Sequence, residues 1–138
     1  MPRLFVLLSH RLTAAQITGA ATQLGVAATA VVYLPRELLD RWAGVPPDAA
    51  LDWSTFLDPF YRWIAEHVTP ADYLLVQGEA GATYALVRTC VARGLRPLHT
   101  TTERRSEEVT TPDGTVRTVR HFLHRAYRLY HDPTAPPA

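Results

Sequence analysis

Short apolar runs alternate with amphipathic segments along the first hundred residues. Four runs have the length and continuous apolar character of strands buried on both faces: 3–8, 28–34, 73–77 and 95–100. Between them, apolar positions recur at helical spacing over 14–24, 36–42, a segment that begins at 52 or 54 and ends near 67, and 82–93. Strand and helix alternate, which predicts an α/β fold with a Rossmann-like, mainly parallel sheet flanked by helices.

After residue 100 the pattern changes. Residues 106–111 and 115–122 read as two polar strands around the turn Pro112-Asp113-Gly114, which predicts a C-terminal antiparallel hairpin over about 104–122. We expect one domain over 1–132 and a flexible Pro/Ala-rich tail over 133–138.

The order of the elements places the first strand between the second and the third. The connections then leave this strand on opposite sides of the sheet and create a topological switch point, where open α/β sheets bind ligands at the carboxyl ends of their strands. Three polar segments should meet at that edge: Ser9-His10-Arg11, Gln77 to Thr83, and Thr100 to Arg105.

Composition narrows the possible functions. The 138 residues contain 14 Arg, no Lys, 13 acidic residues and a formal net charge of +1, which argues against a generally cationic coat for long nucleic acids. A single cysteine, Cys90, excludes an internal disulfide framework and fits a reducing cytoplasm. The chain has no run of 18 apolar residues, so we expect no membrane span and a cytoplasmic protein.

The polar segments offer several candidate groups, each with a structural alternative. His10 directly follows a strand and either moves protons or is merely hydrogen-bonded at the strand end. Gly78 and Gly81 flank a helix start and either present backbone N–H groups to a ligand or only allow a tight turn. Glu79 suits a base edge or a ribose hydroxyl better than a phosphate.

Other motifs point away from common nucleotide sites. The chain has neither GxGxxG nor a Walker loop, and without lysine it has no P-loop chemistry. Thr100, Thr101 and Thr102 offer hydroxyls to a ligand or simply reflect strand propensity. The aromatic residues from Trp53 to Trp63 recur at helical spacing, which favours core or interface packing over a cofactor site. A protein-interaction module that recruits a partner through this helix is a further alternative.

Arginine is concentrated after the fourth strand. Arg104 and Arg105 suit phosphate through their planar guanidinium groups, or form a solvated charged turn with Glu103. Residues 117–131 contain four Arg, three His and no acid, so they could follow a phosphate-bearing ligand or protect an exposed hairpin edge. No carboxylate or Cys completes a metal set with these histidines, and we predict no metal and no cofactor.

Taken together, the strand-end segments resemble a known family. LFVLLSHRLTAAQ, VVYLP, VQGEAGATYALV and TTTERR resemble small stand-alone proteins of the CRISPR-associated Rossmann-fold (CARF) superfamily of type III systems, over residues 3 to about 130. The patterns SHxLT and QGxxGAT are the specific part of this resemblance.

The resemblance implies a homodimer whose two carboxyl edges form one pocket for a cyclic oligoadenylate, such as cyclic tetra-adenylate. Because no effector domain follows the core, it favours a metal-independent ring nuclease that switches the signal off, with a non-catalytic binding or sequestering protein as the alternative. We expect His10, Arg104 and Arg105 to be catalytic. The expected ligand contacts are Ser9, His10, Arg11, Gln77, Gly78, Glu79, Gly81, Ala82, Thr83, Thr100, Thr101 and Thr102.

Overall fold

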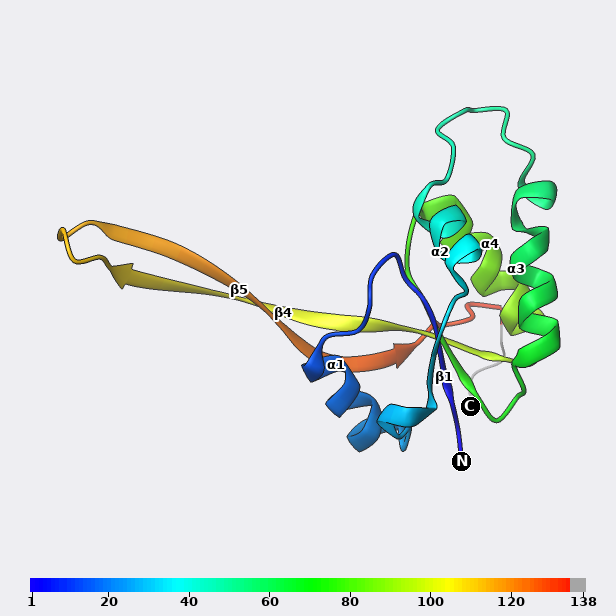
Figure 1. Ribbon diagram of the computed structural model, residues 1–138, viewed down its shortest axis with the longest axis horizontal. Coiled ribbons are helices and arrows are strands. Elements are labelled where there is room, and N and C mark those ends of the chain that lie inside the picture. Colours follow the sequence, from blue (N-terminus) through cyan, green and yellow to red (C-terminus); the bar gives the residue numbers. More distant parts are fainter. Residues whose placement is uncertain (135–138) are drawn as a thin grey trace.

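The protein is built on one five-stranded sheet, in the strand order β2-β1-β3-β4-β5. The computed structural model describes residues 1–134 (Figure 1). The first four strands are parallel and the fifth is antiparallel to its neighbour: β1 (Leu4–Leu7), β2 (Val31–Tyr33), β3 (Tyr73–Val76), β4 (Arg96–Thr110) and β5 (Val116–Leu129). The helices are α1 (Ala14–Gly19), α2 (Arg36–Ala43), α3 (Trp53–His67) and α4 (Ala80–Ala92). The predicted α/β class and the place of the first strand between the second and third are confirmed.

Strand β1 builds a hydrophobic core on each face of the sheet, because its successive side chains point to opposite faces. Leu4 and Val6 pack in the core that α1 covers, whereas Phe5 and Leu7 pack in the core that α2, α3 and α4 cover. Figure 1 shows α1 on one side of β1 and the other three helices on the opposite side. The connections from β1 and β3 therefore leave on different faces, which is the predicted switch point.

Local sequence explains most helix ends. Thr13 and Gln16 form the predicted capping box of α1. The carboxylate of Asp52 accepts a hydrogen bond from the backbone N–H of Thr55 and caps α3. Phe56 and Phe60 of α3 are buried in the core, and Tyr61 and Trp63 pack against it partly buried, whereas Trp53 at the start of the helix is 37% exposed. The core-packing interpretation of this helix is thus correct.

Several predicted boundaries are wrong. The first helix ends at Gly19 and continues as a π-helical turn over Ala20–Leu24, and Ala28–Ala30 form a 3-10 turn before the second strand. Helix α4 begins at Ala80, two residues early, because Glu79 caps it. The largest correction concerns residues 95–111, where Arg96–Thr110 form one continuous strand rather than a strand, a polar loop and a hairpin strand. Pairing with β5 along its whole length holds this segment extended.

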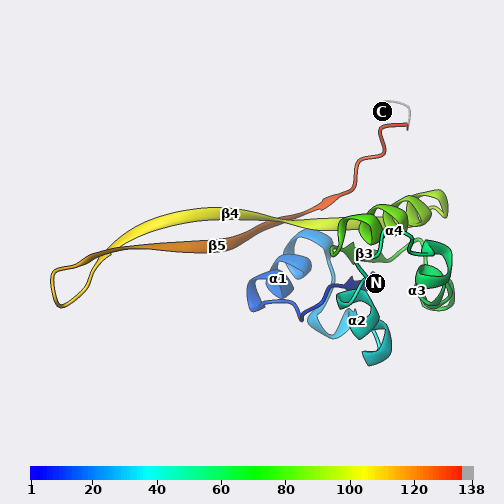
Figure 2. The ribbon, with the colours of Figure 1, turned by 90° about the horizontal axis from the view of Figure 1, so that it is seen from above.

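Beyond the sheet, β4 and β5 continue as a two-stranded arm, which we define as residues 102–123. It begins at an irregularity in register between Thr101 and Thr102 and projects far from the body (Figures 1 and 2). Of the predicted tail, Pro133 and Thr134 form a turn, and residues 135–138 lie outside the described residues. No helix in residues 1–134 is both long enough and apolar enough to cross a membrane.

Asp72 ties the amino end of β1 to the turn before β3. It is 2% exposed and accepts hydrogen bonds from the backbone and guanidinium of Arg3 and from the backbone and hydroxyl of Thr69. Burial alone would raise the pKa of this carboxyl, but the side-chain bond from Arg3 and the bonds from Thr69 and the Arg3 backbone lower it to about 2. The ionised form is therefore the one that stabilises the fold.

We predict that Asp72→Asn lowers the free energy of unfolding at pH 7 by on the order of 2 kcal/mol. Because the folded pKa of Asp72 lies below the ordinary value of 3.8, its contribution is complete above about pH 4 and is lost as the pH falls toward 2. Urea unfolding at pH 7 and pH 3 measures both effects. Asp48→Asn, in an exposed loop, is the control and should change stability by less than about 0.5 kcal/mol. An unchanged acid dependence in Asp72→Asn would contradict this account.

Candidate functional site

A hollow of about 350 Å³ opens at the switch point, between the carboxyl ends of β1 and β3. Its volume lies near the lower end of the range of ligand pockets, ~300–1,000 Å³. One side comes from Ser9, the second residue after β1, and the other from the turn between β3 and α4. Helix α2 and the loop after it form the wall. The lining residues are Ser9, Trp42, Ala43, Val45, Gly78 and Glu79.

Trp42 forms the floor of this hollow through two contacts with the turn after β3. Its indole Nε1 donates a hydrogen bond of 3.0 Å to the backbone carbonyl of Gln77. The ring lies so close to Gly78 that a Cβ there would be 2.7 Å from Nε1. Glycine at position 78 is therefore required for close packing, which is one of the alternatives left open by the sequence. No spacing pattern in the sequence assigns Trp42 to this edge.

The Gln77 side chain connects the end of β3 to β4. Its Oε1 accepts hydrogen bonds from the backbone N–H of Thr100, at 2.8 Å, and from the Thr100 hydroxyl, at 2.9 Å. The Thr101 hydroxyl donates to the carbonyl of Ala126. Of the three predicted threonines, only Thr102 keeps a hydroxyl without a hydrogen bond among the described residues. Gln77, Thr100 and Thr101 thus hold the edge together.

The carboxylate of Glu79 lies at the start of α4, where the backbone N–H groups of a helix can bind an anion. Its two carboxylate oxygens accept hydrogen bonds from the backbone N–H groups of Gly81, at 2.7 Å, and Ala82, at 3.0 Å. The N–H of Thr83 donates to the Glu79 carbonyl. The N–H groups of Gly81, Ala82 and Thr83 are thus already bonded within the chain. Gly81 lies under Trp53, where a Cβ would be 2.7 Å from the indole ring.

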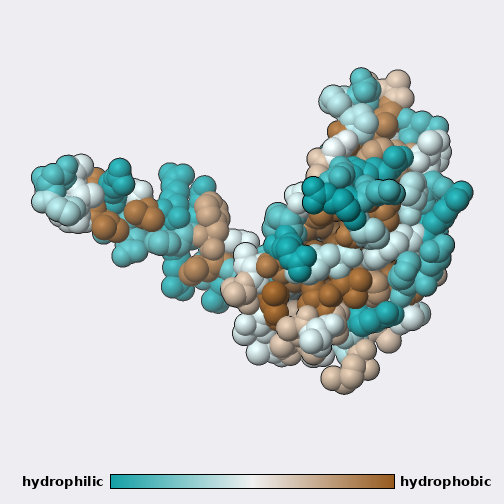
Figure 3. Space-filling model, viewed as in Figure 1, coloured by the Kyte–Doolittle hydropathy of each residue, from teal (hydrophilic) through white to brown (hydrophobic). Residues whose placement is uncertain are grey.

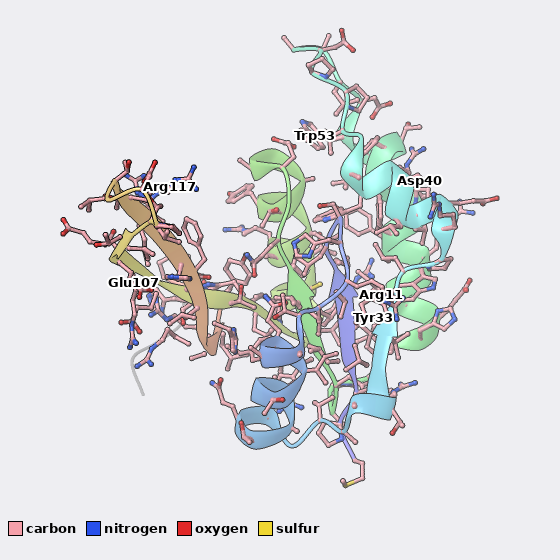
Figure 4. All side chains as sticks on the ribbon, turned by 60° about the vertical axis from the view of Figure 1, so that its left-hand side comes forward. Arg11, Tyr33, Asp40, Trp53, Glu107 and Arg117 are labelled. Carbon is pink, nitrogen blue, oxygen red and sulfur yellow. The ribbon has the colours of Figure 1, made fainter. Side chains whose placement is uncertain are left out.

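His10 and Arg11 follow β1 at the same edge. His10 is exposed, and its Nδ1 lies 3.0 Å from the backbone carbonyl of Arg11. Because a carbonyl oxygen can only accept, Nδ1 carries the proton and Nε2 is left as a proton acceptor. The guanidinium of Arg11 lies 4.0 Å from the ring centre of Tyr33, at the end of β2, and Figure 4 shows the two side chains together. Tyr33 is a residue of this edge that the sequence patterns did not single out.

Arg104 and Arg105 lie in the arm and not beside His10. Thr100 marks the sheet edge, and at about 3.3 Å per residue Arg105 lies roughly 16 Å farther out along β4. Consecutive strand residues point to opposite faces, so the two guanidinium groups diverge. Arg105 is bound to Glu103 at 3.0 Å, whereas Arg104 lies over the Phe122 ring at 5.3 Å. Within one chain, the structure does not bring the three predicted catalytic residues together.

The histidines of β5 form no metal centre. No group of three or more His, Cys, Asp or Glu side chains that could hold a metal ion occurs in residues 1–134. His121 contacts Glu107 at 3.2 Å. The His124 ring packs against Gly19 of α1 and the Tyr127 ring, and burial lowers its pKa. His124 therefore helps to seat α1 on the sheet.

We predict that Gly78→Ala destabilises the protein by about 1–3 kcal/mol, because the new methyl group collides with the Trp42 indole. Trp42→Phe removes the atoms nearest to that methyl group. The double variant should therefore lose less stability than the sum of the two single variants, a coupling that a double-mutant cycle of urea unfolding measures. Strict additivity would show that Gly78 is not needed for close packing.

Comparison with known proteins identifies the family. No solved structure matches the chain. "Uncharacterized protein MJ1673" of Methanocaldococcus jannaschii is 38% identical over 130 residues, which cover 94% of this chain and 98% of that protein. The family model described as "Uncharacterized protein MJ1673 family" matches residues 2–128. The chain therefore belongs to the MJ1673 family.

Proposed function

We propose that this protein binds a cyclic oligoadenylate, such as cyclic tetra-adenylate, at the carboxyl edge of its parallel sheet and cleaves it without a metal ion. The observation that carries the proposal is the hollow at the switch point, with a histidine and an arginine on the loop beside it. The resemblance of the strand-end segments to CARF proteins of type III CRISPR systems points to the same edge. The protein would act in the cytoplasm.

The lining of the hollow suits a nucleoside. The Trp42 indole is 2% exposed and packs against Gly78 and Phe60, so it supports the hollow from below and leaves the polar contacts to Glu79 and Ser9. The oxygens of Glu79 can accept a further hydrogen bond from an adenine amino group or a ribose hydroxyl. Ser9 supplies a hydroxyl at the opposite wall. A hollow of about 350 Å³ has room for one nucleotide unit, so a ring of several units requires the edges of two copies in a homodimer.

His10 and Arg11 carry the proposed chemistry. A ribose 2′-oxygen attacks the adjacent phosphorus while the bond from phosphorus to the 5′-oxygen breaks, which yields a linear product with a 2′,3′-cyclic phosphate and a 5′-hydroxyl. Nε2 of His10 accepts the proton of the 2′-hydroxyl, and the protonated ring can then return a proton to the 5′-oxygen. The Arg11 guanidinium stabilises the charge that grows on the phosphoryl oxygens.

A non-catalytic binding protein is the second candidate. The specific observation in its favour is that Arg104 and Arg105 lie in the arm, so one chain offers only Arg11 beside His10. A protein that holds the ring without cleaving it would lower the free concentration of the messenger.

We predict that the protein converts a cyclic oligoadenylate to a linear product in the presence of EDTA, because no step needs a metal. Mass spectrometry of cyclic tri-, tetra- and hexa-adenylate after incubation measures the conversion. Tight binding of an intact ring would favour the sequestering alternative. The absence of both cleavage and any shift in melting temperature would refute the proposed function.

We expect His10→Ala to lower the cleavage rate by about 10²–10⁴-fold, while the dissociation constant of the ring stays within a few fold. His67→Ala is the matched control, because His67 is also exposed and its Nδ1 also contacts a backbone carbonyl, that of Trp63. Single-turnover kinetics and a binding titration separate the two effects. A wild-type rate in His10→Ala would remove the catalytic role.

A further inference from the structure

The outer edge of β4 has no partner strand along the arm. Strand β3 pairs with β4 only from Arg96 to Leu98, and the Gln77 side chain then bonds to Thr100. From Thr102 to Thr110, β4 is hydrogen-bonded to β5 on one side, and no described strand lies on the other. A free strand edge is a template for pairing with another chain. An isolated two-stranded hairpin is also only marginally stable in water, whereas three or more strands are stable.

We propose that this edge pairs antiparallel with the same edge of a second copy, around a two-fold axis at Ser106. Residues at equal distances before and after the axis then lie opposite each other. Arg104 faces Glu108 of the second copy, and Arg105 faces Glu107 of the second copy. The sequence RRSEE is thus complementary in charge to itself, and a dimer has four such pairs.

The geometry of the strand selects this register. Alternate residues of a strand turn their N–H and C=O groups toward opposite neighbours, so the axis must pass through a residue and not between two. An axis at Arg105 would set Arg105 against its own copy and Glu103 against Glu107 of the second copy. An axis at Glu107 would set Glu107 against its own copy. The axis at Ser106 avoids every like-charge pair, and Ser106 is also the midpoint of the free edge 102–110.

The unpaired charges of the arm fit the proposed register. Arg104 and Glu108 are exposed, and neither has an ion-pair partner within residues 1–134. Cross-strand pairing would join them on one face of the ribbon. On the other face, Glu107 already contacts His121 and Arg105 contacts Glu103, so the new pair links two existing contacts.

The opposite edge of the arm, on β5, cannot pair with itself in this way. Within the arm, from Val116 to Leu123, it contains Arg117 and Arg120 and no acidic residue. Two copies of this edge therefore form no pair of opposite charges in any register. Edge charges of one sign are a common protection against unwanted pairing. The two edges of the arm therefore differ in their charge pattern, and only the edge of β4 is complementary in charge to itself.

The interface gives this dimer a defined form. A continuous four-stranded ribbon, β5-β4-β4-β5, would support the exposed apolar side chains of the arm, which Figure 3 shows among polar ones. They are Val109, Val116, Phe122 and Leu123. Thr110 would lie opposite Thr102 of the second copy, which brings each hairpin tip beside the other copy's sheet edge. The axis at Ser106 sets the two Thr100 residues roughly 40 Å apart, twelve residues at about 3.3 Å each, so this dimer does not join two sheet edges in one pocket. It is independent of the homodimer of the proposed function, and its test contains no nucleotide.

Charge reversal tests the register. Arg104→Glu/Arg105→Glu and Glu107→Arg/Glu108→Arg each place like charges opposite each other in a homodimer. We expect wild type to sediment as a dimer of 15.4 kDa chains, and each variant to raise the dimer dissociation constant by about tenfold or more. A mixture of the two variants should form a heterodimer, and the variant with all four changes should regain the homodimer. Arg117→Glu/Arg120→Glu, on the β5 edge, is the control and should stay dimeric.

A monomeric wild type would overturn the proposal, as would dimers that neither reversal weakens or a mixture that forms no heterodimer. A cysteine variant tests the same axis without charge reversal. Under mild oxidant, Ser106→Cys should link two copies through a disulfide, because the axis places residue 106 opposite itself. Thr118→Cys, on the outer strand, should not link. Failure of Ser106→Cys to link, or equal linking of both variants, would contradict an axis at Ser106.

Discussion

The pairing of β1 between β2 and β3 is the constraint on which the rest of the structure depends. All four residues of β1 are buried, since each face of the strand supplies one of the two cores. Because α1 covers one face and the later helices cover the other, the connections that follow β1 and β3 leave the sheet on opposite faces. This opens a gap at the carboxyl end of β1. The hollow is therefore a consequence of how β1 is buried, and the polar residues that follow it, Ser9 to Arg11, are placed there by the same arrangement.

Gln77 decides where the sheet ends and the arm begins. Its backbone carbonyl accepts a hydrogen bond from the Trp42 indole. Its side-chain oxygen accepts a hydrogen bond from the backbone N–H of Thr100, as a neighbouring strand would. The next residues turn away at Gly78 and start α4 under the cap of Glu79. Beyond Thr100, β4 therefore has no neighbour on that side. One side chain thus sets both the wall of the hollow and the start of the free strand edge.

The fold followed from local patterns, whereas the site depended on contacts that no pattern specifies. Continuous apolar runs predicted four parallel strands, because strands covered on both faces cannot alternate with polar residues. The sequence pattern does not indicate the extended state of residues 101–105, since these polar residues are held by pairing with β5 and not by burial. Likewise, Trp42 and Tyr33 reach the edge through packing. Glycine at 78 was predicted as a turn, but the tryptophan that requires it lies 36 residues away in the chain.

The distribution of arginine bears on the proposed cyclic oligoadenylate site. Most of the 14 arginines have structural partners: Arg3 binds Asp72, Arg41 binds the carbonyls of Thr55 and Phe56, and Arg96 binds the carbonyl of Asp72. The arginines of the arm lie beyond the sheet. Arg11 is the cation that follows β1, and its guanidinium lies over the aromatic ring of Tyr33. Because a cyclic oligoadenylate carries one negative charge per phosphate, a single Arg11 cannot neutralise the ring. In the proposed function, two edges related by a two-fold axis would supply two guanidinium groups in a symmetric arrangement, which matches the symmetry of a ring with an even number of units.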